Sequence, residues 1–157
     1  MDRINALSTG TKIMAAAGLL LLIDTFLRWQ EVCVGSGGFE VCGGESAWGN
    51  FWGVLLGLLT LVLLVWVGLQ IANVDMSSVN LPVTDGMLSL GLGALIFVLA
   101  LLKNLIDDYS TIWSYIGVGL AALVAVGGYL RYQELGGEPM RRSTPTDTPS
   151  SAPPPPA

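Results

Sequence analysis

The sequence predicts an all-α membrane protein, a transmembrane four-helix bundle with a small disulfide-pinned hairpin in one loop. Four long apolar segments carry this prediction, because a hydrocarbon core of about 30 Å needs about 20 helical residues. The composition agrees: 12% of residues are charged, against about 25% in soluble domains. We expect residues 1–134 to form one membrane domain with spans at residues 13–29, 51–72, 87–106 and 112–130.

The first span has an alternative interpretation as a cleaved secretory signal, because two cations precede a short apolar run. Small residues open that run instead of closing it, and the residues after Ile23 make a poor cleavage site. We therefore expect this segment to remain as a membrane anchor. Ser8, Thr9 and Thr11 precede its helix and can cap it.

The later spans are more strongly apolar. Residues 51–72 contain 22 residues without a charge, and residues 112–130 contain 19. Thr84 and Asp85 are a helix-start signal before the third span. The turn at residues 107–111 is short, so the third and fourth spans should form an antiparallel pair.

The distribution of cations predicts the orientation in the membrane, since short loops rich in lysine and arginine stay in the cytoplasm. Two of the seven cations, Arg28 and Lys103, lie toward the loops at residues 30–50 and 107–111. We expect a bacterial plasma membrane protein with both termini in the cytoplasm. The other five cations lie on the terminal side: Arg3, Lys12, Arg131, Arg141 and Arg142.

The segment at residues 135–157 differs from the rest of the chain. It is rich in proline, serine and threonine and ends in a run of four prolines before Ala157. Such a composition cannot bury a core, so we expect a disordered, partly polyproline tail.

The outer loop at residues 30–50 holds both cysteines of the chain, Cys33 and Cys42. A two-residue turn at Gly37-Gly38 places Cys33 opposite Cys42, and Gly-Gly is an allowed hairpin turn. The predicted orientation puts this loop in an oxidising compartment. We therefore predict a disulfide. A redox pair is the functional alternative, although membrane thiol oxidoreductases use closer pairs and more than two cysteines.

Three charged residues lie within the predicted spans. Asp24 and Arg28 are four residues apart, so in a helix they share one face. Lys103 lies near the outer end of the third span, one turn before Asp107. Intramembrane charges are candidates for function, but we favour a structural cluster that fixes the first span against the third.

Small residues recur at four-residue spacing, which allows close approach of helices in lipid. We expect them to pack the four helices against each other, with a stripe that mediates oligomerisation as the alternative. These candidates are Gly53, Gly57, Ser89, Gly93, Gly117, Ala121 and Ala125.

The run at residues 20–29, LLLIDTFLRW, is followed by a glycine-rich loop and by Ser46-Ala47-Trp48-Gly49. It resembles small uncharacterised four-span membrane proteins of actinobacteria. The resemblance covers about the first 130 residues. It implies location and architecture, and no activity.

No segment contains a recognisable catalytic motif, and the chain has no histidine. We therefore expect a non-enzymatic membrane protein without cofactor, metal site or nucleic-acid partner. It would pack in the lipid bilayer with a second copy or with another membrane protein. The alternatives are a small transporter or channel subunit that uses Asp24, Arg28 and Lys103, and a membrane thiol-disulfide oxidoreductase.

Overall fold

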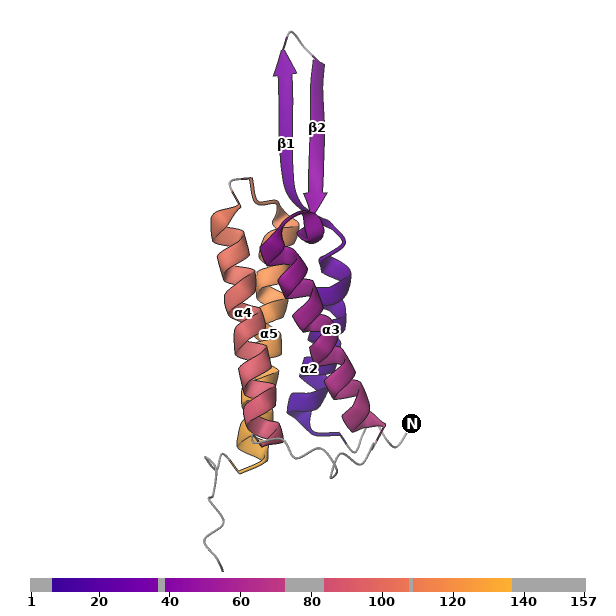
Figure 1. Ribbon diagram of the computed structural model, residues 1–157, viewed down its shortest axis with the longest axis vertical. Helices are drawn as coiled ribbons and strands as arrows, with labels where there is room; N and C mark the ends of the chain where they lie inside the picture. The colour runs from indigo at the N-terminus through magenta and orange to yellow at the C-terminus, as the bar shows by residue number, and fades with distance from the viewer. Residues whose placement is uncertain (1–6, 37–38, 73–83, 108, 137–157) are drawn as a thin grey trace, which may run out of the picture.

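The computed structural model describes residues 7–36, 39–72, 84–107 and 109–136, which form a helix bundle with a projecting β-hairpin (Figure 1). Gly37-Gly38, the predicted turn, and residues 137–157, most of the predicted tail, lie outside the described residues. The elements in chain order are α2 (Thr9–Asp24), β1 (Arg28–Ser36), β2 (Phe39–Ser46), the 3-10 helix η1 (Ala47–Gly49), α3 (Phe51–Ile71), α4 (Asp85–Ile106) and α5 (Ile112–Glu134).

Three of these helices, α3, α4 and α5, are long and apolar enough to cross a membrane, with 21, 22 and 23 residues. The predicted spans at 51–72 and 87–106 agree with α3 and α4 within two residues, and α5 runs four residues beyond 130. Thr84 caps α4 as predicted, because its hydroxyl accepts a hydrogen bond from the Met87 backbone at 3.4 Å.

The predicted boundaries of the first span are wrong. Helix α2 begins at Thr9, capped by the Ser8 hydroxyl, and ends at Asp24 instead of Trp29. Its 16 residues correspond to about 24 Å at a rise of 1.5 Å each. The helix stops there because the chain turns at Thr25, whose hydroxyl donates to the Leu22 carbonyl at 2.6 Å. Trp29 lies in strand β1. The sequence places it in the helix because it is hydrophobic and continues the apolar run.

Helix α5 lies between α2 and α4 and makes its most extensive contacts with these two. Small residues let the backbones meet. A Cβ atom placed on Gly127 would lie 3.0 Å from the Gly10 carbonyl oxygen of α2. On the α4 side, a Cβ on Gly93 would lie 3.1 Å from the Cα of Ala125. The candidates Ser89, Gly93 and Ala121 are buried in this helix packing.

Helix α3 packs less closely on α4 than α5 does. An apolar groove of about 620 Å³ separates part of α3 from α4. Five of its lining side chains are aliphatic residues of α3, and α4 contributes Leu88 and Leu92. This surface suits contact with lipid tails. In Figure 1, α3 moves away from α4 with increasing distance from the hairpin. The groove is lined by Leu58, Leu61, Val62, Val65, Trp66, Leu69, Leu88 and Leu92.

Strands β1 and β2 form an antiparallel hairpin that extends well beyond the ends of the helices (Figure 1). The predicted register is confirmed: Cys33 pairs with Cys42 and Val34 pairs with Val41. A disulfide joins the two cysteines. With strands of nine and eight residues, the hairpin is longer than the small loop that we expected.

Candidate functional site: the hairpin and the polar cluster beneath it

The hairpin has a base inside the protein and a tip outside it. We define the hairpin base as residues 28–31 and 45–47, and the hairpin tip as residues 32–36 and 39–44. Trp29 and Ala47 of the base are fully buried. In the tip, Val34 is 71% exposed. The tip therefore depends on its own ladder and its disulfide, while the base is part of the folded core.

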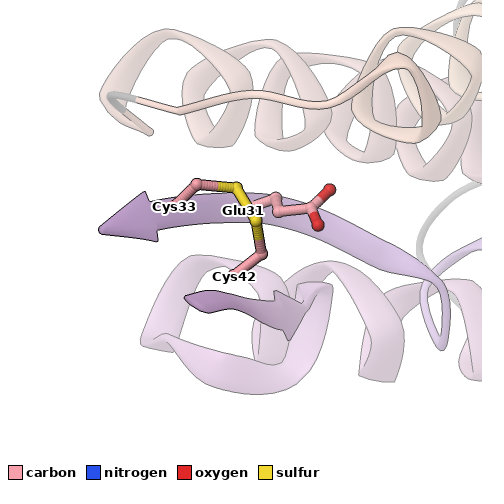
Figure 2. A group of neighbouring side chains, drawn as sticks. All are labelled: Glu31, Cys33 and Cys42. Atoms are coloured by element: carbon pink, nitrogen blue, oxygen red, sulfur yellow. A yellow bond between two sulfur atoms is a disulfide. The ribbon is translucent and has the colours of Figure 1, made fainter. Parts of the chain in front are cut away.

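The disulfide lies on one face of the hairpin tip beside a carboxylate. Figure 2 shows the Glu31 side chain next to the bonded sulfur atoms of Cys33 and Cys42. The potential ligand atoms of these three residues lie within 4.8 Å of one another. Because the two sulfur atoms are bonded to each other, neither is the thiolate that a metal such as zinc requires.

The hairpin base is fixed to the turn between α4 and α5. The Thr111 amide donates to the Trp29 carbonyl at 3.0 Å, and the Glu31 amide donates to the Tyr109 carbonyl at 3.3 Å. A bridge pairs Gln30 with Ser110. This turn acts as a short third strand along the outer edge of β1, so the direction of the hairpin is fixed by backbone hydrogen bonds.

Trp29 fills the space under the hairpin. Its indole N–H donates to the Asp24 carbonyl at 2.9 Å, and the Lys103 ammonium nitrogen lies 5.5 Å from its ring centroid. A Cβ atom on Gly117 would lie 2.3 Å from the Trp29 ring. The candidate Gly117 therefore provides room for this tryptophan, in addition to any role in helix packing.

Lys103, in the last turn of α4, and Asp107, the residue after that helix, form a buried ion pair. Their side chains are 1% and 2% exposed, and the ammonium nitrogen lies 2.5 Å from the carboxylate. The Asn50 amide donates to the other Asp107 oxygen at 3.2 Å. The Asn50 side-chain oxygen accepts from the Gly53 amide at 2.9 Å and so caps α3. This network connects the end of α4 to the start of α3, and a buried pair needs such additional hydrogen bonds.

The short helix η1 covers the start of α3. The Trp48 indole N–H donates to the Thr25 hydroxyl at 3.1 Å, and the Ala47 amide donates to the Thr25 carbonyl at 3.1 Å. A Cβ on Gly53 would overlap the Ala47 carbonyl, and one on Gly57 would lie 2.5 Å from the Trp48 ring. Gly53 and Gly57, which we expected to pack against another helix, therefore face η1, and a Cβ on Gly53 would also lie 2.9 Å from the Lys103 side chain of α4.

The predicted pairing of Asp24 with Arg28 is also wrong. Helix α2 ends at Asp24, so the four-residue spacing no longer places both side chains on one helix face. Arg28 lies in β1 and is near Glu31, at 3.9 Å, with its side chain 69% exposed. Asp24 is 3% exposed, and neither of its carboxylate oxygens has a hydrogen-bond partner among the described residues.

Four residues from four elements come together at the hairpin end of the bundle. They are Asp24 of α2, Trp29 of β1, Gly117 of α5 and Lys103 of α4. Sequence reasoning identified Asp24 and Lys103 by their charge within apolar segments, and Asp107 by its spacing from Lys103. It did not identify Asn50 or Trp29. The available signal for Asn50 was its position immediately before a long apolar run, where a helix cap is expected.

The chain matches no protein-family model, no curated protein and no solved structure.

Proposed function

We propose that the chain is a non-enzymatic integral membrane protein of a bacterial plasma membrane that presents its hairpin tip to another protein outside the cell. The observation that carries this proposal is the contrast within the hairpin. Its base is held by hydrogen bonds to the α4–α5 turn and to the Asp24 carbonyl, whereas its tip has exposed apolar side chains, with Val32 at 42% and Val34 at 71%. Exposed valines on a fixed strand pair are suited to binding a partner.

The membrane arrangement is part of the proposal. Helices α3, α4 and α5 can each cross a bilayer, and α2 packs along α5, which supports α2 as the fourth span. Four spans place both termini on one side, in agreement with the cation distribution. The hairpin then lies on the opposite side, where its disulfide is stable.

Site-specific photo-crosslinking in intact cells tests this function. A photoreactive amino acid at Val34 should give a discrete adduct with a second protein. The control places the same photoreactive amino acid at Val62, an exposed position in the apolar groove. It should give mainly lipid adducts. If neither Val34 nor other tip positions give a protein adduct in cells that express the chain at its natural level, the proposed role is wrong.

A small transporter or channel subunit is the second candidate, and the carboxylate of Asp24 favours it. This buried group has no hydrogen-bond partner in the described part of the chain, and it lies close to Trp29, which contacts Lys103. The variant Asp24→Asn distinguishes the two functions. Unchanged adducts at Val34 with unchanged solute uptake support the binding role, whereas normal abundance with lost uptake supports transport.

A further inference from the structure

The two outer edges of the hairpin are not equivalent. Near its base, β1 is already paired on its outer side with the α4–α5 turn, through Gln30 and Ser110. In the two-stranded sheet β2 pairs with β1 alone. Along the described part of the chain, no backbone hydrogen bond joins the outer edge of Phe39–Ser46 to another segment. An unpaired edge offers a row of N–H and C=O groups to an added strand.

Two adjacent glycines make this edge accessible. Gly43 and Gly44 are exposed, and a Cβ atom placed on Gly43 would meet nothing within 4 Å. These glycines border a hollow of about 440 Å³ on one face of the hairpin, which is also lined by Glu45 and by Gln30 and Val32 of β1. A backbone without side chains next to a hollow allows another backbone to approach closely.

The charge of the hairpin selects the kind of strand that fits. Residues 28–46 contain three glutamates, Glu31, Glu40 and Glu45, and one cation, Arg28. Arg28 is at the base, near Glu31. Glu40 and Glu45 both lie on β2 and are exposed. A second copy paired edge to edge through β2 would place two glutamates of each copy, and no cation, along the shared pair of strands, so it offers no charge partner for them.

We propose that the outer edge of β2 binds an extended, lysine- or arginine-containing segment of another protein as a third strand of the sheet. This inference rests on the proposed function and specifies the partner. Main-chain hydrogen bonds along Phe39–Ser46 provide the affinity. Glu40 and Glu45 select for cations, and the hollow at Gly43 admits a side chain of the added strand.

Three synthetic peptides test the inference on the full-length chain in detergent, by fluorescence anisotropy. The first alternates lysine and valine, the second replaces each lysine with glutamate, and the third is the first with alternate backbone nitrogens methylated. The first should bind. The methylated peptide should bind about tenfold more weakly because one edge of its ladder is blocked, and the acidic peptide should not bind.

Two variants identify the edge that is used. A Cβ on Gly43 would meet nothing within 4 Å, so Gly43→Val adds a side chain beside the hollow and should weaken binding of the first peptide. Glu45→Gln should weaken it severalfold at low salt and less at high salt. Asp85→Asn, the same charge change at an exposed position in the first turn of α4, is the control and should have no effect.

The outcomes separate this inference from the proposed function. Equal binding of the methylated and unmethylated peptides, or no binding of either, overturns strand addition. A protein adduct at Val34 in cells together with either of these results leaves the hairpin as an interaction element and rejects only the β2 edge. If no protein adduct forms at Val34 either, both the β2-edge inference and the proposed function are rejected.

Discussion

The hairpin base and the hairpin tip belong to the same two strands but are stabilised in different ways. Trp29, in the base, is fully buried, and Val34, five residues further along β1, is 71% exposed. The base is held by contacts with α2, α4, α5 and η1, whereas the tip is held by its strand ladder and one disulfide. Strand β1 is therefore buried and fixed near its start, at Trp29, and exposed to solvent farther along. Substitutions should therefore affect the two parts separately.

The largest effect is expected at the ion pair beneath the base. Lys103→Met leaves Asp107 buried without its cation and should lower the free energy of unfolding by about 3–5 kcal/mol. Thermal unfolding in detergent, followed by circular dichroism, measures this. The double variant Lys103→Met, Asp107→Leu should recover much of the loss. A single variant as stable as the wild type would show that the pair does not hold the base.

Removing the disulfide should act on the tip alone. Replacing Cys33 and Cys42 with serine should destabilise the hairpin by about 2–3 kcal/mol, because closing so short a loop restricts the unfolded chain by that amount. Protease cleavage between β1 and β2 should become faster, while the helical unfolding transition stays within about 0.5 kcal/mol. A large change in the helical transition would mean that the tip and base are coupled.

Gly117→Ala should lower the free energy of unfolding by about 1–3 kcal/mol, because the new methyl group would clash with the Trp29 ring and the Asp24 carboxylate. Gly119→Ala, two residues along α5, is the matched control, since its Cβ would meet nothing within 4 Å. It should be neutral or slightly stabilising. Thermal unfolding of the two variants side by side is the measurement, and equal stabilities would contradict the packing described here.

The smallest effect is expected for the cap of α3. Asn50→Ala removes both the hydrogen bond to the Gly53 amide and the one to Asp107, and should cost about 1 kcal/mol. Asn50→Asp keeps an acceptor for the Gly53 amide, but its carboxylate would face Asp107. It should therefore be no more stable than Asn50→Ala if the contact with Asp107 matters, and clearly more stable if capping alone matters.

The elements of this fold were predictable where a local pattern determines them. Long uncharged runs identify α3 and α5, and a turn placed at Gly37-Gly38 predicts the observed pairing of Cys33 with Cys42. The end of α2 was not predictable in this way, because Leu27 and Trp29 continue the apolar pattern of the helix. It is the hydrogen bonds of Thr25 and of the Trp29 indole, both tertiary or turn contacts, that end α2 at Asp24.

The candidate site was predictable only in its charged residues. Charges within apolar segments are conspicuous, so Asp24 and Lys103 were identified, and the position of Asp107 one turn after Lys103 was noted, although their ion pair was not predicted. A stripe of small residues indicates close contact but does not identify what fills the space. Gly53 and Gly57 therefore suggested a neighbouring helix, whereas Ala47 and Trp48 of η1 lie against them, with the Lys103 side chain of α4 also close to Gly53.

The short length of α2 has a consequence for the surrounding lipid. If this helix crosses the membrane beside α3, its 16 residues give an apolar length several ångströms below the usual hydrocarbon thickness of about 30 Å. The bilayer next to α2 must then become locally thinner, so that the polar ends of this helix stay outside the hydrocarbon core. We expect this hydrophobic mismatch to favour thin bilayers, so that reconstitution into lipids with shorter acyl chains should raise the thermal stability of the protein.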